Sequence, residues 1–250
     1  MGLMKSRRIR FIAFSLRLLE RYLFDPKLKR MLRRAISNSK SVSNSKYKNL
    51  IFFDIGANRG QTIRLLKSMY PESCIYSFEP DPVIFSNHLS LNKWQGVQIF
   101  NLALGDSAGR FPFWVSPIDE TSTLYLPDTN SAWNKKKALL LGLTPETMYE
   151  RIEVDVVRLD EFISRESIDR IDLLKIDVEG GELQVLQGAS TSIKSGIISV
   201  VQFESHDDDL RPSQKPEIED FLLAHGFYHD SSVKHAFGDF HDEIWVKYIQ

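Results

Sequence analysis

Apolar runs of strand length alternate with helix-length segments from about residue 50 onward. Short continuous apolar runs bounded by turn residues are typical of parallel strands that are buried on both faces. The alternation predicts an α/β fold with a doubly wound, mostly parallel sheet. The predicted strands are 50–55, 74–78, 97–104, 171–177 and 197–203, with two closing strands near 227–233 and 243–249. The predicted helices are 61–70, 81–93, 181–189 and 214–225.

The segment after the third predicted strand breaks this pattern. Residues 110–116 alternate like a hairpin strand, 117–150 are irregular or helical, and 153–158 form another strand. We interpret 105–151 as an insertion whose aromatic side chains form either a lid over a ligand or a small satellite core. These side chains are Phe111, Phe113, Trp114, Tyr125, Trp133 and Tyr149.

The formal net charge of −1 hides a strongly basic N-terminal stretch. Residues 1–48 carry 14 Lys or Arg against two acidic residues, a local charge of +12, which leaves the other 202 residues at −13. Arginines interleave with apolar residues through 8–24, so a helix there has a basic side and an apolar side. Arg10 and Arg17 exclude a membrane span and disfavour a signal peptide. Two interpretations remain: peripheral contact of 1–34 with an anionic membrane surface or partner groove, or a helix packed on the domain.

Composition sets the remaining bounds. A Ser/Asn-rich stretch at 37–45 reads as a linker, so we expect a basic helical extension at 1–46 and a folded domain at 47–250. The single cysteine, Cys74, excludes an intramolecular disulfide and favours a reducing, cytoplasmic setting. If residues 1–34 contact a membrane, we expect it to be the inner face. Lys135, Lys136 and Lys137 are interpreted as a solvated face, and no nucleic-acid partner is expected.

Carboxylates follow four of the five central strands. In doubly wound sheets ligands bind outside the carboxyl ends of the strands, where these side chains gather. The first strand ends in Asp54, the second in Glu79, the fourth in Asp177 with Glu179, and the fifth in Glu204 with His206.

The turn after the first strand, Gly56-Ala57-Asn58-Arg59-Gly60, allows a ligand to approach the backbone. The following helix offers unpaired amides to a carboxylate or phosphate. The turn lacks the third glycine of a dinucleotide fingerprint and the Lys-Ser/Thr of a P-loop, which weakens NAD and ATP readings. Glu79 is placed to accept hydrogen bonds from both ribose hydroxyls of an adenosine.

Five segments in order resemble the FkbM family of S-adenosylmethionine-dependent methyltransferases. They are Asp-Ile-Gly-Ala-Asn-Arg-Gly at 54–60, Phe-Glu-Pro-Asp-Pro at 78–82, Asn-Leu-Ala-Leu-Gly-Asp at 101–106, Leu-Asp at 159–160 and Leu-Lys-Ile-Asp-Val-Glu-Gly-Gly-Glu at 174–182. The resemblance covers about 50–206. It implies a class I methyltransferase sheet of seven strands with the last antiparallel, and O-methylation of a sugar, glycan or natural-product hydroxyl.

The resemblance also implies roles for residues at matching positions, with S-adenosylmethionine as the cofactor. Its methionine end would be held by Asp54, Gly56, Asn58 and Gly60, and its ribose by Glu79. Asn101, Ala103 and Leu104 would lie beside the adenine. Asp177 would face the cofactor amine and the acceptor pocket.

Transfer to oxygen needs the acceptor placed about 3 Å from the methyl group and a base for its proton. His206 and Glu204 are the candidates, with Asp177 at the same edge. Alternatively, Asp177, Glu179, Glu204 and His206 converge on a divalent cation such as magnesium. Purely structural roles are also open, for example Glu179 and Glu182 as favourable charges at a helix N-terminus.

Two other function classes share this fold. A dinucleotide-binding oxidoreductase would use the same ribose acid but needs the missing glycine. A catalytically silent, membrane-associated scaffold would keep the basic extension, and the intact Asp54, Glu79 and Asp177 argue against it.

Overall fold

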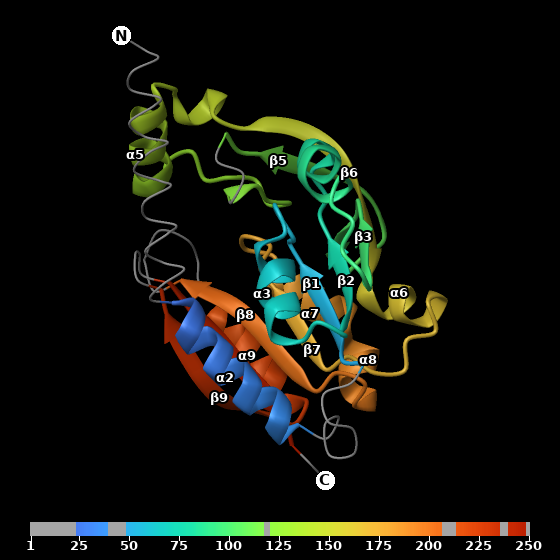
Figure 1. The fold of residues 1–250 in the computed structure, drawn as a ribbon. Coiled ribbons are helices and arrows are strands. Elements are labelled where there is room, and N and C mark those ends of the chain that lie inside the picture. The colour runs from blue at the N-terminus through green and yellow to red at the C-terminus, as the bar shows by residue number, and fades with distance from the viewer. Residues whose placement is uncertain (1–23, 40–48, 118–120, 207–213, 236–239, 249–250) are drawn as a thin grey trace.

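The computed structural model describes residues 24–39, 49–117, 121–206, 214–235 and 240–248. A seven-stranded sheet crosses it in the order β3-β2-β1-β7-β8-β10-β9, with helices on both faces (Figure 1). All neighbouring strands pair parallel except β10, which lies antiparallel between β8 and β9. The predicted doubly wound sheet with an antiparallel last strand is therefore confirmed.

The observed elements follow the predicted ones with small shifts. The strands of the large sheet are β1 (Ile51–Ile55), β2 (Cys74–Phe78), β3 (Val97–Phe100), β7 (Leu173–Ile176), β8 (Val200–His206), β9 (Phe227–Lys234) and β10 (Phe240–Lys247). The helices around it are α2 (Asp25–Asn38), α3 (Gln61–Met69), α4 (Pro82–Ile84), η2 (Phe85–Leu89), α6 (Leu159–Arg165), α7 (Glu182–Gly188), α8 (Ser190–Ser195) and α9 (Lys215–Ala224).

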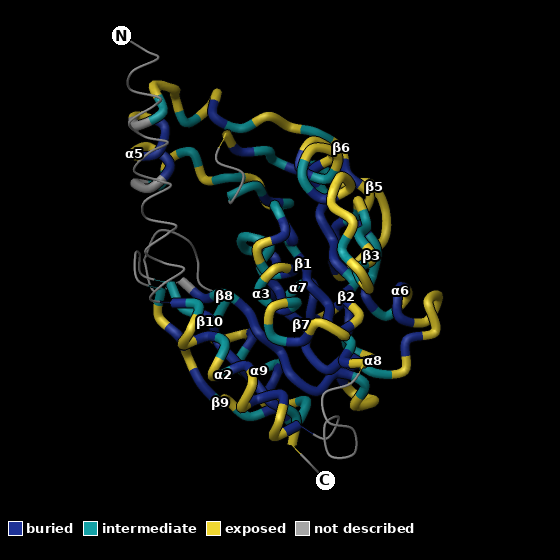
Figure 2. The backbone as a smooth tube through the Cα atoms, in the orientation of Figure 1, coloured by how far each residue is buried: buried dark blue, intermediate teal, exposed yellow. Residues whose placement is uncertain are grey.

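The central strands are mostly apolar and largely buried, because the sheet is covered on both faces (Figure 2). Phe52 of β1 is fully buried against α2 and α3, and its neighbour Phe53 is fully buried against α6 to α9. Side chains of consecutive strand residues point to opposite faces, so one run of five residues supplies both hydrophobic clusters. Because these central strands run parallel, their carboxyl ends lie at one edge of the sheet.

Helix α2 is part of this packing. Pro26 and Asp25 start it, as suits a first turn. Leu28, Leu32 and Ile36 recur on one stripe, are at most 5% exposed, and share a cluster with Val233 and Val246 of the sheet. Residues 25–38 therefore form a helix packed on the domain, the second of the two interpretations of the basic stretch. The helix expected at 8–24 and the domain boundary expected at 47 lie outside the described residues.

The strand predicted at 97–104 is wrong in one respect, because it divides between two sheets. β3 ends at Phe100, and β4 (Ala103–Gly105) joins β6 (Glu150–Arg158) and β5 (Gly109–Val115) in a separate three-stranded sheet. Asn101 causes the break, since its side-chain amide donates to the backbone oxygens of Glu79 (2.8 Å) and Pro80 (3.0 Å). The chain is thereby held against the end of β2 rather than continuing in the sheet.

The inserted segment carries this second sheet, α5 (Ala132–Leu141) and η4 (Pro145–Thr147). Phe113 packs with Val154 and Val156 in a small cluster, so the satellite-core interpretation is confirmed for this residue. Glycine 188 of α7 lies against β4 so closely that an added Cβ would stand 2.0 Å from the carbonyl oxygen of Gly105. The second sheet is therefore pinned to the helix that follows β7.

Two further differences concern individual segments. The helix predicted at 81–93 ends at Leu89 after a π-helical turn. Lys135 and Lys136 are exposed as expected, but Lys137 is 3% exposed and donates to Ser116 (2.8 Å), so its interpretation as a solvated charge is wrong. No helix within the described ranges is long and apolar enough to cross a bilayer.

Candidate active site

The turn after β1 lies directly against the end of β7. Gly56 has φ +84°, and an added Cβ would stand 1.8 Å from the carbonyl oxygen of Asp177. Only glycine combines this left-handed conformation with so close an approach. Gly60, with φ +79°, then starts α3, whose first turn has no side-chain cap among the described residues. The turn therefore brings the backbone amides of α3 to the edge of the sheet where Asp177 directly follows β7.

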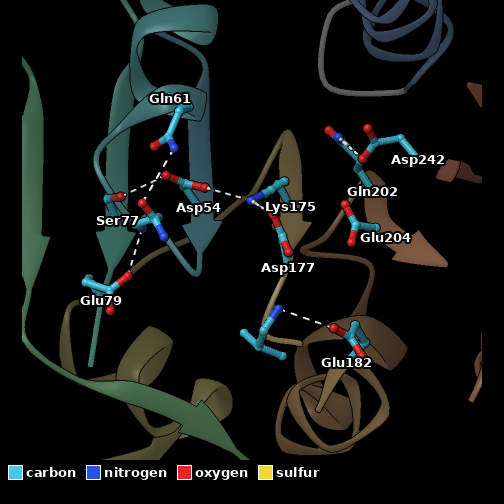
Figure 3. Close-up of polar contacts among 12 residues, drawn as sticks. Asp54, Gln61, Ser77, Glu79, Lys175, Asp177, Glu182, Gln202, Glu204 and Asp242 are labelled. Carbon is cyan, nitrogen blue, oxygen red and sulfur yellow. Dashed lines mark hydrogen bonds and ion pairs between the residues drawn. The ribbon is translucent and has the colours of Figure 1, made fainter. Parts of the chain in front are cut away.

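Glu79 is held at the end of β2 by the backbone of two turns, and Figure 3 shows where its side chain lies. Its Oε2 accepts from the amide of Asn58 (2.8 Å), and its Oε1 accepts from the amide of Asp81 (2.9 Å). Burial raises the pKa of Glu79 to about 7, although these two amide hydrogen bonds oppose the shift. The residue is 6% exposed, and each carboxylate oxygen keeps lone-pair capacity for a further donor.

Asn58 and Asn101 make hydrogen bonds within the protein, to the loops around Glu79. Asn58 has φ +46°, and its side-chain oxygen accepts from the amide of Arg59 at 2.7 Å. Asn101 fixes the carbonyl groups of Glu79 and Pro80, as described above. Both residues therefore shape the loop that holds the Glu79 carboxylate.

A cavity of about 310 Å³ lies between the second sheet and the start of α7. Leu104 and Val178 contribute apolar walls, and Phe111 and Tyr125 of the insertion complete it. Ala103 is buried in the small cluster instead. Phe111 and Tyr125 thus border this cavity, and their role as a lid over a ligand stays a prediction. The side chain of Trp133 lies outside the described residues.

A row of polar side chains crosses one face of the sheet, and all of them except the half-buried Asp177 are buried (Figure 3). Ser77 donates to Oδ2 of Asp54 (2.9 Å), and Nζ of Lys175 lies 3.6 Å from Oδ1 of Asp54 and 3.0 Å from Oδ2 of Asp177. These positions alternate with apolar residues of β1, β2 and β7, so all point to the face covered by α2 and α3. The lysine joins two of the strand-end acids.

The charges of this row are interdependent. Burial opposes ionisation of Lys175, but Asp177 and Asp54 outweigh it and hold the pKa of the lysine above its ordinary value. Burial raises the pKa of Asp54, with partial compensation from Lys175 and Ser77. Asp54 is 0% exposed, so its carboxylate faces protein rather than solvent. Sequence reasoning missed Lys175, although a lysine inside an otherwise apolar, buried strand signals a buried ion pair.

The side chain of Glu182 holds the turn after β7. Its Oε1 accepts from the amides of Val178 and Gly180, both at 3.2 Å. Glu182 is 7% exposed, and burial raises its pKa. Its role in the fold is to hold this turn, which differs from the favourable charge at a helix N-terminus that the sequence suggested.

Asp177, Glu179 and Glu204 form an acidic cluster in which one carboxylate oxygen from each lies within 4.8 Å of the others. Burial, followed by the charges of Asp177 and Glu179, raises the pKa of Glu204 well above its ordinary value. Acidic groups gather in this way without a metal as well, so the cluster alone does not establish the divalent cation. The convergence expected for these three residues is nevertheless present.

The backbone of His206 pairs with Phe240 in the sheet, but its side chain lies outside the described residues. A different histidine reaches the cluster. Nε2 of His235 lies 3.0 Å from Oδ2 of Asp242 and 4.0 Å from Oε2 of Glu204. Asp242 also accepts from the side chain of Gln202 at 2.7 Å. No local pattern distinguishes His235 and Asp242, because only strand pairing brings these late residues beside β8.

The sequence of the chain matches a known protein family. The family described as Methyltransferase FkbM domain matches residues 54–228. The chain is 30% identical over 190 residues to Methyltransferase sdnD of Sordaria araneosa, covering 69% of this chain and 73% of that one. It is 31% identical over 194 residues to 31-O-demethyl-FK506 methyltransferase FkbM of Streptomyces tacrolimicus, covering 71% and 72%.

One solved structure supports the fold. The crystal structure of Methyltransferase FkbM from Methylobacillus flagellatus KT superimposes with a TM-score of 0.53 at 15% sequence identity. The match covers 84% of this chain and 47% of that one, so this chain spans less than half of that longer protein.

Proposed function

The protein belongs to the FkbM family of methyltransferases, and we propose that it moves the methyl group of S-adenosylmethionine to a hydroxyl oxygen of a sugar, glycan or natural-product acceptor. The observation that carries the cofactor assignment is Glu79, a nearly buried carboxylate fixed by two backbone amides at the end of β2. A carboxylate there suits the two hydroxyl donors of a ribose. Transfer to oxygen is supported by the relative whose name specifies a 31-O position.

The residues present fit such a cofactor. Glu79 has acceptor capacity left for ribose, and the uncapped first turn of α3 suits a carboxylate group. Gly56, Asn58 and Gly60 shape that turn, and Leu104 offers an apolar wall at the neighbouring cavity. The cofactor would supply an electrophilic methyl group. Asp54 would help to hold the methionine end by fixing Lys175, which in turn bonds to Asp177.

The acidic cluster supplies the proton acceptor in this proposal. Glu204 would accept the proton of the acceptor hydroxyl, and the bound cofactor would supply the methyl group that takes the place of that proton on the oxygen. Its raised pKa makes Glu204 a stronger base than an ordinary carboxylate. Asp177 would orient the acceptor from the next strand. His206 remains the second candidate base, and a divalent cation on the cluster remains an addition to this scheme.

The setting proposed for this reaction is the cytoplasm. Its support is the single cysteine of the chain, which agrees with a reducing compartment.

Calorimetric titration with S-adenosylhomocysteine, in parallel with NADH, tests the proposal before any acceptor is known. We expect micromolar binding of S-adenosylhomocysteine that Glu79→Ala weakens by about 1–3 kcal/mol, the scale of lost charged hydrogen bonds. Glu72→Ala, which changes an exposed glutamate just before β2, is the matched control and should bind normally.

Binding of NADH alone would replace the proposal with the oxidoreductase. Silence toward both ligands would favour the scaffold.

A further inference from the structure

The two sides of α2 differ completely in character. Its apolar side is used up against the sheet, where Leu28, Leu32 and Ile36 are at most 5% exposed. Its opposite side faces solvent and is basic, with exposed side chains at Lys27, Arg30, Arg33 and Arg34 and a half-buried one at Lys29. Helix α2 therefore has no exposed apolar side that could insert into the acyl chains of a membrane.

The basic side is only slightly neutralised. Helix α2 carries five basic residues and one acidic residue, Asp25. Arg34 pairs with Asp230 at 2.7 Å, and within the described ranges it is the one cation of α2 with an acidic partner. Residues 49–250 carry a net charge of −13, so this face is a local positive surface on an acidic domain.

We propose that the outward face of α2 docks on a membrane surface rich in anionic lipid headgroups. A flat surface touches one side of the molecule, and each Lys or Arg held near anionic headgroups contributes attraction. Docking by α2 is purely electrostatic, because its apolar side is already buried in the fold. This inference goes beyond the proposed methyl transfer and does not depend on it.

Two observations favour a membrane over a nucleic acid. Nucleic acids require a broader basic surface than one helix provides. The sequence immediately before α2 also mixes arginines with bulky apolar residues through 8–24, a composition suited to the boundary between headgroups and acyl chains.

The position of α2 links this surface to the active site. Phe24, at its first turn, stacks on His235 with ring centroids 3.8 Å apart. Nε2 of His235 lies 4.0 Å from Oε2 of Glu204 in the acidic cluster. A docked α2 therefore holds the Glu204 end of the site close to the headgroups.

The test is sedimentation of the full chain with vesicles of phosphatidylcholine alone and with vesicles of phosphatidylcholine and phosphatidylglycerol in equal amounts. The variant Lys27→Gln/Arg30→Gln/Arg33→Gln removes three exposed cations from α2. The control Lys135→Gln/Lys136→Gln/Lys194→Gln removes three exposed cations elsewhere. Thermal unfolding of each variant shows that it is folded.

We expect binding to the anionic vesicles alone, and a loss of about fivefold for each α2 cation removed, or about 100-fold for three. The control should bind like the wild type. Raising the ionic strength from about 0.1 M to about 1 M, which shortens the screening length from about 10 Å to about 3 Å, should abolish binding.

Absence of vesicle binding, equal binding to neutral vesicles, or undiminished binding by the α2 variant would each overturn the proposal. Binding to a nucleic acid in place of vesicles, lost in the α2 variant, would reassign the surface.

Discussion

Nζ of Lys175 lies 3.6 Å from Oδ1 of Asp54, a carboxylate with no exposed surface, at the centre of the seven-stranded sheet. The same ammonium group bonds to Asp177 at 3.0 Å. Asp54 lies in β1 shortly before the glycine turn, and Asp177 directly follows β7, so one cation joins the two strands beneath the candidate site. A buried residue of the sheet, Lys175, thereby positions Asp54 and Asp177 beside the candidate site.

Replacement of this cation should be costly. Lys175→Met leaves a buried carboxylate without its counter-charge, and we expect the free energy of unfolding to fall by about 3–5 kcal/mol, measured by urea denaturation. The double variant Asp54→Asn/Lys175→Met removes the stranded charge and should recover part of this loss. A double variant that costs the sum of the two single changes would show that the residues do not interact.

Glu79 should make cofactor binding depend on pH. Its pKa is about 7 in the folded protein, so the ionised form, which in the proposed site would accept from two ribose hydroxyls, becomes more populated as the pH rises. The affinity for S-adenosylhomocysteine should rise about tenfold between pH 6 and pH 8. Calorimetry across this range measures it, and Glu79→Gln should flatten the profile. An equally steep profile in Glu79→Gln would assign the dependence to another group.

The same residue predicts the opposite trend for stability without ligand. Its folded pKa of about 7 exceeds the unfolded value of 4.5, so the folded state holds the proton more strongly between these values. Its contribution to the unfolding free energy therefore falls as the pH rises from 4.5 to 7, by about 3 kcal/mol in total. Urea denaturation of wild type and Glu79→Gln across this window isolates the contribution, which the substitution should remove.

The contact of Gly56 with β7 can be separated from its backbone conformation. Gly56→Ala adds both left-handed strain and a clash with the carbonyl of Asp177, whereas Gly142→Ala, with φ +71° and nothing within 4 Å, adds strain alone. We expect the control to cost about 1–2 kcal/mol of unfolding free energy and Gly56→Ala clearly more, together with loss of S-adenosylhomocysteine binding. Equal costs would mean that the loop moves away freely.

Gly188 should be intolerant for a different reason. A methyl group there meets the backbone of Gly105, so Gly188→Ala must push α7 away from β4. We expect a loss of about 1–3 kcal/mol in unfolding free energy. Gln187→Ala, an exposed change in the same helix turn, should be nearly neutral. A neutral Gly188→Ala would show that the second sheet is loosely attached.

The layered fold could be predicted because its strands are short, apolar and separated by polar helices. Phe52 and Phe53 need no further information to be placed on opposite faces of a buried strand. The acids at strand ends could be predicted for the same reason, since the end of each run is visible in the sequence. Local periodicity therefore reached β1, β2, β7 and β8 directly.

What could not be predicted depends on contacts between distant residues. Asn101 ends β3 by bonding to carbonyls 21 and 22 residues earlier, although the apolar pattern continues past it. Asp242 and His235 reach Glu204 through the pairing of β10 and β9, which no local spacing encodes. Lys137 is buried among hydroxyl groups although it belongs to a run of lysines.

The late position of β10 has a consequence for how the site comes into being. β10 inserts between β8 and β9, and it carries the Asp242 that faces Glu204 and His235. During synthesis β8 is an open edge strand until the chain has emerged beyond residue 240. The glycine turn and Glu79 can assemble early, from neighbouring parts of the chain. The acidic end of the site matures last, when the hairpin of β9 and β10 closes the edge.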